Sequence, residues 1–572
     1  MISGLLVDSG KAALYKRGSN QISSGEEGFM RRYLVFLLAF FLMLPLSVKA
    51  ATKPSTEELL RRIEQLSREL EALKRQLAEV KEAQEERVEA AEENAEFIEE
   101  LKNNMGKFKV WGDIRTRMDS TRAYVPEYTN PFLSFPGAAR AGGHHYENDT
   151  LYTNRMRLNL KVKPTEDTVV KMRLAYYKIW GMSNDYVAPG LFLGMGMKNN
   201  FTYGIRPSDD NLYVDRAYFN WSNIGGLPVW VSFGRRPTTH GAPRQLREGL
   251  DKRDATPSGI NFDVPFDGAT IGYQYSWPWP GRIRICYGRG FESGFKTPID
   301  RAKDDVDFYG IAWDVIDDPD RDMLLIVQAF KAEGVMDFPD GQIYMYNPYF
   351  GQWMEAFRTA TTNLGDLYEI GATWQHKVDL PFLGLEGVDY FVSAGLSIAD
   401  PDEWSTLSMP TQSGIYYVHV SLLNGPYLST SPVPPGDDDL DTKTGWAIWL
   451  GTRIPIPKLN SKLGLEYNYG SKWWMPFAMA TDDPYIDKIA TRGHVAEIYW
   501  IWDLPVGEAM SEYAKAFLRI GYQYFWFNYT GSGSWLGKPM AIRSELNEAP
   551  YQLFSAPIDH MSNFYLSLEL FF

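Results

Sequence analysis

The residues in this chain that most clearly suggest a function are arginines and lysines that alternate with apolar side chains, as in residues 151–163. Successive side chains of an extended strand point to opposite faces, so this pattern predicts one basic and one apolar face. A basic face along an aqueous passage lowers the electrostatic barrier to anions. If such strands enclose an aqueous lumen, Glu369, Asp389 and Glu466 are predicted to face it together with the basic residues. A lumen without anion preference is therefore the alternative. The predicted pore-lining basic residues, here called the basic ladder, are Arg115, Arg117, Arg155, Arg157, Lys161, Lys171, Arg173, Arg216, Arg282 and Arg284.

A second group of charged residues follows the segment Gly234-Arg235-Arg236-Pro237, in the third long connection of the chain. If this connection folds into the lumen of a barrel, its side chains form a constriction that selects solutes. The alternative is an exposed polar loop. The candidate constriction residues are Arg235, Arg236, His240, Arg244, Arg247, Lys252 and Arg253.

Residues for catalysis, metal binding or cofactor attachment form no recognisable pattern. Cys286 is the only cysteine, which excludes an intramolecular disulfide, and no Cys-x-x-Cys-His motif is present to attach haem. The seven histidines are scattered apart from His144 and His145. A hydrolase would need a nucleophile with histidine and carboxylate partners, and no local signature of one is found. We therefore predict no enzyme activity, no metal site and no cofactor.

The N-terminal region predicts the cellular compartment. Arg31 and Arg32 precede an apolar run that closes on Val48-Lys49-Ala50, which is the pattern of a secretory signal peptide at residues 30–50. The apolar run is shorter than the roughly 20 residues that a membrane-spanning helix requires. Residues 1–29 precede a plausible start at Met30, and we interpret them as a misassigned N-terminal extension.

Residues 51–105 have the composition and periodicity of a coiled coil. The segment Ser55 to Glu58 is a capping box, so a helix begins there. Large apolar residues then recur at alternating steps of four and three, which is the pattern of a left-handed coiled coil. A lone solvated helix would expose this seam, so we expect self-association, with a trimer preferred. The seam consists of Leu59, Ile63, Leu66, Leu70, Leu73, Leu77 and Val80.

From Phe108 onward the period changes from helical to two, which predicts strands over residues 106–572. Short turns near Pro164 and at six later positions alternate with long connections such as 237–265 and 400–443. Strict alternation of short and long connections is typical of an outer-membrane β-barrel. We predict about 16 antiparallel strands, or 18 if Tyr416–Leu423 and a partner join the wall.

The last nine residues alternate apolar and mixed side chains and end on an aromatic residue. In this position the strand resembles the C-terminal assembly signal of outer-membrane β-barrels, which implies the barrel-assembly machinery as a partner. We expect Phe572 to face lipid beside the strand that begins at Phe108. The residues of this signal are Phe564, Leu566, Leu568, Leu570 and Phe572.

Several segments resemble a bacterial family of unknown function whose members look like porins with an N-terminal coiled coil. These include Leu151–Leu160, Val214–Tyr218, Trp221–Trp230, Gly234–Pro237 and Cys286–Phe291. A more distant resemblance is to coiled-coil-bearing trimeric porins, including phosphate-selective ones. Neither resemblance transfers a substrate.

Together these patterns predict an outer-membrane porin, a passive channel for small hydrophilic and preferentially anionic solutes, with its coiled coil in the periplasm. The expected partners are membrane lipid, lipopolysaccharide and two further copies of the chain, and no nucleic acid. One alternative is a barrel that encloses a periplasmic multihaem cytochrome as an electron conduit. A second alternative is a structural protein that spaces the envelope.

Overall fold

The computed structural model divides into two compact units, residues 1–100 and 101–572. In the first unit it describes residues 56–57, 60–61, 63–78, 80–81 and 84. In the second it describes residues 107–130, 139–181, 206–207, 210–294, 304–337, 343–347, 352–357, 362–411, 414–436, 440–478, 482–505, 511, 513–547 and 557–572. The predictions for residues 1–29 and for the signal peptide lie outside the described residues.

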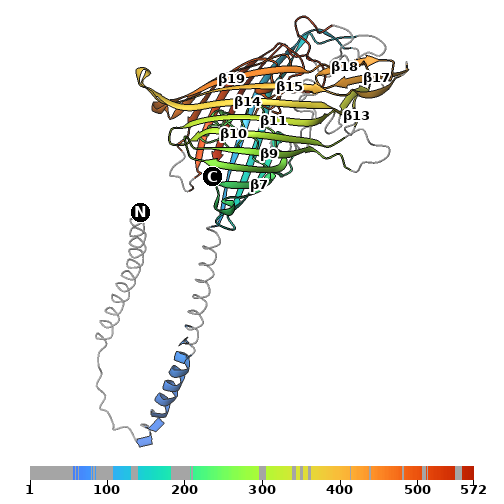
Figure 1. The fold of residues 1–572 in the computed structure, drawn as a ribbon. Helices are drawn as coiled ribbons and strands as arrows, with labels where there is room; N and C mark the ends of the chain where they lie inside the picture. The colour runs from blue at the N-terminus through green and yellow to red at the C-terminus, as the bar shows by residue number, and fades with distance from the viewer. Residues whose placement is uncertain are drawn as a thin grey trace. The chain divides into compact units, whose positions relative to one another are not determined.

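The second unit is a closed barrel of 16 strands in which neighbours pair antiparallel (Figure 1), as the alternating sequence predicted. The first and last strands pair with each other, and all other neighbours follow chain order. The strands are β1 (Phe108–Val125), β4 (His144–Val162), β5 (Thr168–Ile179), β6 (Tyr213–Trp221), β7 (Val229–Arg235), β8 (Asp267–Tyr275), β9 (Gly281–Phe291), β10 (Val306–Asp318), β11 (Met323–Met336), β14 (Asn363–Leu380), β15 (Leu385–Pro401), β19 (Lys443–Ile456), β20 (Ser461–Gly470), β21 (Gly493–Asp503), β22 (Lys515–Phe527) and β23 (His560–Phe571).

The connections are short at one end of the barrel, the turn end, and long at the other, the loop end. Small sheets form within the long connections: β2 (Tyr128–Asn130) pairs with β3 (Ala139–Ala141), and β12 (Ile343–Asn347) pairs with β13 (Gln352–Phe357). The segment Tyr416–Leu423 forms most of β17 (Gly414–Ser421), between β16 (Ser405–Thr411) and β18 (Asn424–Ser429). Because this three-stranded sheet is separate from the barrel, the alternative count of 18 strands is wrong.

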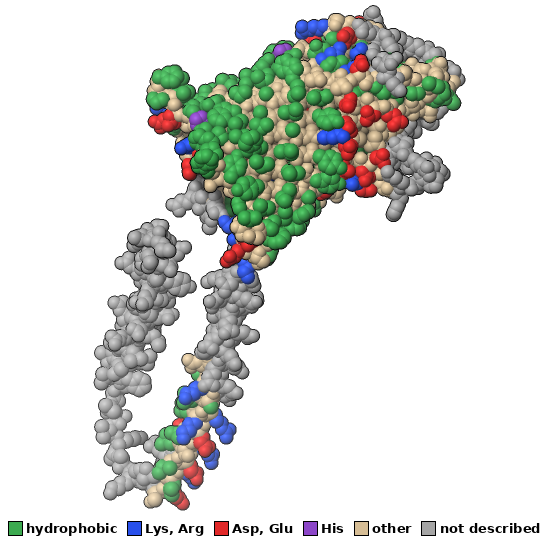
Figure 2. Space-filling model, viewed as in Figure 1, with side chains coloured by type: hydrophobic (Ala, Val, Ile, Leu, Met, Phe, Trp, Pro, Cys, Tyr) green, Lys and Arg blue, Asp and Glu red, His purple; other side chains and the backbone are tan. Residues whose placement is uncertain are grey.

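The outer surface of the barrel carries a broad apolar belt (Figure 2). Its side chains alternate with inward residues, and Ile271, Ile285 and Ile311 are each more than half exposed. Toward the loop end, outward positions become charged, and Arg289 pairs with Asp307 there at 2.8 Å. An apolar exterior that ends at a charged band is the surface a membrane-spanning barrel requires.

The barrel closes where Gly112 meets the C-terminal residue. The backbone N–H of Gly112 donates to the Phe572 carbonyl at 2.9 Å, and the Phe572 N–H donates back at 3.0 Å. Phe572 is 42 % exposed on the outer surface, beside the first strand, as predicted. Phe564, Leu568 and Leu570 also face outward.

In the first unit, the described residues between 56 and 84 are helical. Leu59 lies outside the described residues; the other six seam residues are exposed, with relative exposures between 56 and 65 %. Self-association through this face stays a prediction. Among the described residues, no helix is long and apolar enough to cross a membrane.

The closing pair generates the first testable prediction. A Cβ atom at Gly112 would lie 2.7 Å from the Phe572 ring and 2.5 Å from the Arg157 carbonyl oxygen. We expect Gly112→Val to destabilise the closed barrel by about 1–3 kcal/mol, the usual cost of overpacking. The folded fraction, read from the heat-dependent mobility shift on a gel, should fall. Gly436→Val is the matched control, because nothing lies within 4 Å of a Cβ atom there. Equal folded fractions for the two variants would contradict the prediction.

Candidate functional site

Two long connections fold into the lumen of the barrel. We call residues 236–266, between β7 and β8, and residues 471–478 and 482–492, between β20 and β21, the plug loops. Every residue of 236–249, 258–265, 474–478 and 482–492 is buried. The inner wall is buried as well, because each of the 16 strands contributes a buried residue on its lumen side. These are Arg115, Arg157, Arg173, Arg216, Ser232, Thr270, Arg284, Asp314, Gln328, Thr373, Ser393, Trp449, Glu466, Glu497, Arg519 and Ser567.

The first plug loop runs from the loop end of the barrel to the turn end. Its buried helix α4 (Arg244–Arg247) is followed by Gly249, whose carbonyl accepts a hydrogen bond from Lys515 Nζ at 2.6 Å. Asp251 then pairs with Arg453 at 2.7 Å. Lys515 and Arg453 both lie near the turn end of their strands. The tip of this loop therefore reaches the opposite mouth of the barrel from the one where the loop begins.

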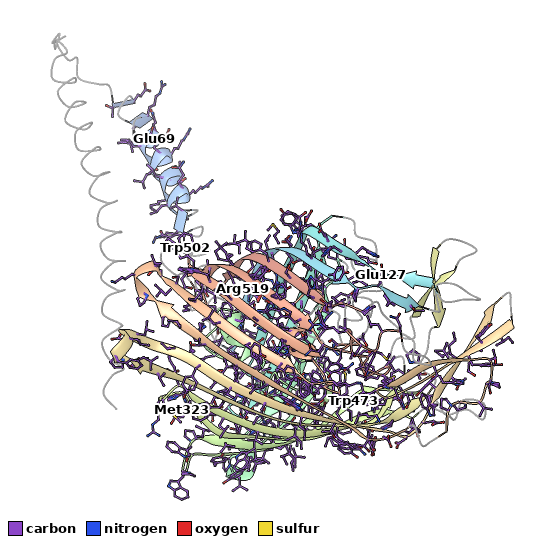
Figure 3. All side chains as sticks on the ribbon, turned by 90° about the horizontal axis from the view of Figure 1, so that it is seen from above. Glu69, Glu127, Met323, Trp473, Trp502 and Arg519 are labelled. Carbon is purple, nitrogen blue, oxygen red and sulfur yellow. The ribbon has the colours of Figure 1, made fainter. Side chains whose placement is uncertain are left out.

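The second plug loop places two adjacent carboxylates against the arginines of the wall. Asp482 forms an ion pair with Arg115, and it pairs with Arg519 at 2.7 Å and with Arg117 at 3.3 Å. Figure 3 labels Arg519 on β22, between the ends of the barrel. Asp483 pairs with Arg247 of the first plug loop. The two plug loops therefore hold each other as well as the wall.

The first plug loop carries its own counter-charges for a neighbouring part of the wall, on β5 and β6. Asp254 pairs with Arg173 at 2.5 Å and with Arg216 at 2.8 Å. Burial alone would raise the pKa of Asp254, but these two arginines and Arg157 hold it well below its ordinary value. Asp254 therefore stays ionised at neutral pH. A buried charge without a partner is strongly destabilising, so these pairs hold the loop in the lumen.

An aromatic cluster closes the loop end above the ion pairs. Phe262 of the first plug loop packs on Phe330 of β11, with ring centroids 5.1 Å apart. Phe477 of the second plug loop packs on Phe308 of β10 at the same centroid distance. Trp535, from the last long connection, belongs to the same buried cluster. Sequence reasoning missed this cluster, because its members lie in loops and on strands far apart in the chain.

The basic ladder faces the interior, but it does not form a free basic surface. Arg115, Arg117, Arg155, Arg157, Arg173, Arg216 and Arg284 are buried, and each of them pairs with a carboxylate. Arg282 is partly exposed and pairs with Asp314 at 2.6 Å. Lys161 and Lys171 are half-buried, and no ion pair with another described residue is found for either. In this state the ladder is therefore largely neutralised, by carboxylates of the wall strands such as Asp113 and Asp314 and by Asp482 and Asp254 of the plug loops.

The candidate constriction residues divide into three groups. Arg236, His240, Arg244 and Arg247 are buried within the lumen, and Arg253 reaches Asp314 at 2.7 Å. Lys252 is exposed at the tip of the loop. The prediction for Arg235 is wrong. This last residue of β7 is at a position whose side chain faces outward, and it lies 3.5 Å from Asp267 of β8.

Within the part of the chain that the structure describes, no group of three or more histidine, cysteine or acidic side chains could hold a metal ion. Cys286 is a free thiol on β9, and Thr270 donates a hydrogen bond to its sulfur at 3.4 Å.

The fold and the site together define an antiparallel membrane β-barrel whose lumen is closed by its own loops. The chain belongs to the family described as "Protein of unknown function (DUF3373)", whose model matches residues 145–572. The resemblance to an uncharacterised family is thereby confirmed. A search of curated proteins found no match.

Solved structures similar to this chain include outer-membrane proteins. OmpT of Vibrio cholerae is 11 % identical with a TM-score of 0.35, over 81 % of this chain and 97 % of that chain. OprB of Pseudomonas putida is 11 % identical with a TM-score of 0.37, over 83 % and 96 %. An anion-selective porin from Comamonas acidovorans is 10 % identical with a TM-score of 0.35, over 81 % and 99 %. The strand order, rather than these matches, establishes the architecture.

The Asp482 ion pairs generate a second prediction. Asp482→Asn removes the charge that Arg115, Arg117 and Arg519 share, and breaking a buried pair costs about 3–5 kcal/mol. We expect a lower thermal unfolding midpoint in detergent, measured by circular dichroism. Asp210→Asn is the control: Asp210 lies 3.2 Å from Lys178 but is largely exposed, so its change should stay within about 0.5 kcal/mol. If the two variants unfold at the same temperature, the Asp482 pairs do not stabilise the barrel.

Proposed function

We propose that this protein is an outer-membrane channel of the porin type and that its plug loops close the channel at rest. Small hydrophilic solutes pass through the barrel when the plug loops are displaced. The observation that carries the proposal is the plug itself: loops that enter from one mouth, held to the wall by ion pairs. Ion pairs and polar surfaces can be rehydrated when a loop moves, and separating the aromatic cluster around Phe262 and Phe477 adds an apolar cost that favours the closed state.

The outer membrane is the compartment that the remaining features support. The belt is apolar, the long connections share one end of the barrel, and a signal peptide is predicted upstream. In this setting the proposed partners are lipid, lipopolysaccharide and the barrel-assembly machinery, which would act on the C-terminal strand that ends at Phe572.

Opening would change the charge of the lumen. Asp482, Asp483 and Asp254 all belong to the plug loops, whereas the arginines they neutralise belong largely to the wall. Displacement of the plug loops therefore removes the carboxylate partners of Arg115 and Arg216 and leaves Arg519 with Glu569 of β23. Lys161 and Lys171, for which no ion pair with a described residue is found, add to this positive charge. A lumen with exposed positive charge favours anions, so we propose anion preference for the open state only.

The two alternative functions have less support. A cytochrome enclosed by the barrel would occupy the space that the plug loops fill, and both loops would have to leave. An envelope spacer needs no inward charge, yet buried ion pairs extend around this lumen. The channel explains the polar interior, and neither alternative does.

Planar-bilayer recording tests the channel. We expect the wild-type protein to be closed for most of the recording. Asp482→Asn combined with Asp483→Asn should increase the open fraction at least about tenfold, which corresponds to about 1.4 kcal/mol taken from the closed state. In a salt gradient, the reversal potential of the open channel should indicate anion preference.

Asp210→Asn serves again as the control and should behave as wild type. If the wild-type channel is constantly open, the proposal that the plug loops close it is wrong. Silence in the double variant at every voltage would sink the channel, and cation preference would sink the anion assignment.

The exposed seam of the N-terminal helix supports self-association, and we propose a trimer. Leu70→Asp with Leu77→Asp introduces charge into the seam and should dissociate the oligomer on a native gel. Gln65→Asp with Ala72→Asp adds the same charge on positions away from the seam and should leave the oligomer intact. If the seam variant stays trimeric, the barrel walls alone hold the assembly.

A further inference from the structure

A small cavity lies between the first plug loop and the inner wall formed by β8 to β11, with a volume of about 70 Å³. Arg236 and Thr238 border it at the start of the loop. On the wall it is bordered by Thr270 and Cys286. The cavity is therefore bordered jointly by the first plug loop and by the barrel wall.

Arg236 brings a positive charge to this cavity without a matching negative one. The side chain is 5 % exposed, and its Nη1 atom has no hydrogen-bond partner among the described residues. Its guanidinium lies over the ring of Tyr218, 5.5 Å from the centroid. Tyr218 and Cys286 are the ionisable groups that act on it, and no carboxylate of the described residues does so.

The contrast with the other buried arginines is informative. Arg244 and Arg247 of the same plug loop each pair with acidic groups. No carboxylate of the described residues pairs with Arg492 either, but it donates to the carbonyls of Trp474, Thr530, Gly531 and Ser534. Within the described part of the chain, Arg236 has neither kind of partner. Burial of an unpaired charge costs several kcal/mol unless something else compensates it.

The lining of the cavity restricts what could compensate the charge. Phe262, Phe266, Phe308 and Phe330 all line it, and two of its polar groups are already engaged: Gln328 donates to the Ser258 carbonyl at 3.2 Å, and Thr238 Oγ1 donates to the Val264 carbonyl at 2.6 Å. A multivalent oxyanion such as phosphate needs many donors to replace its hydration shell, and this lining has few. A monovalent anion of small size needs one charge and little more.

We propose that the cavity is a binding site for a small monovalent anion of the halide or nitrate class, held by the Arg236 guanidinium. The bound anion completes the charge balance of the first plug loop. Because loop and wall both border the site, binding stabilises the loop in the lumen relative to any state in which it has left. Anion binding by Arg236 does not depend on whether solutes pass through the barrel.

Cys286 provides a direct probe, because it borders the cavity and is the only cysteine of the chain. The uncharged reagent methyl methanethiosulfonate is applied to the purified full-length protein in detergent, with nitrate replacing gluconate at constant ionic strength. Nitrate should slow labelling saturably, and the rate should fall roughly tenfold at about ten times the dissociation constant, since the rate follows the unoccupied fraction.

Three variants identify the ligand group. Arg236→Gln should abolish the nitrate dependence, and Arg236→Lys, which keeps the charge, should retain part of it. Arg235→Gln, one residue earlier on the outer face, should behave as wild type. The nitrate-dependent rise of the thermal unfolding midpoint gives a second readout that does not need thiol reactivity, and it should be lost in Arg236→Gln alone. Retained mobility shift on a gel shows which variants are folded.

The proposal is overturned if nitrate changes neither labelling nor unfolding of the wild-type protein, or if its effect persists in folded Arg236→Gln. If Arg236→Gln does not fold, a nitrate effect that is reduced but present in folded Arg236→Lys supports the site, and an effect equal to that of the wild-type protein overturns it. Failure of the channel in bilayers leaves this result unchanged, because labelling and unfolding require no conductance.

Discussion

The structure depends on how charge is balanced inside the barrel. A wall of arginines is stable in a closed lumen only when carboxylates reach it, because an isolated buried guanidinium is far less stable than a hydrated one. Asp482 and Asp254 supply part of those carboxylates from the plug loops, where they meet Arg519 and Arg216, and wall residues such as Asp113 and Asp314 supply others. The same pairs therefore neutralise the wall and hold the loops that close it.

Two apolar constraints complement this polar interior. Outside, the belt of isoleucine and aromatic side chains matches the bilayer, and the Gly112–Phe572 pair completes the ring, so the barrel has no free edge. At the loop end, the cluster around Phe262 and Phe477 covers the ion pairs from above. The interior thus has an aromatic layer toward the loops and a charged layer below it, and a moving plug loop must separate both.

The arrangement links selectivity to closure. In the closed state carboxylates of the wall and of the plug loops together neutralise the wall arginines, so the described lumen offers little free charge apart from residues such as Lys161 and Lys171. An anion beside Arg236 would neutralise the one guanidinium of the first plug loop that has neither a carboxylate nor a carbonyl partner among the described residues. Charge balance, rather than pore diameter, would then govern when the barrel opens.

Local pattern in the sequence determined the barrel: the period of two set which side chains face inward, and alternating connection lengths indicated 16 strands and the position of both mouths. These features are local, because strand pleat and turn length depend on neighbouring residues. Only the tertiary structure decided what the inward arginines do. Arg115 and Asp482 are 367 positions apart, and their pairing depends on the path of a loop through the lumen. For the same reason Arg235 and Arg236 could not be told apart, since the point where the strand ends puts one in the membrane-facing surface and the other in the cavity.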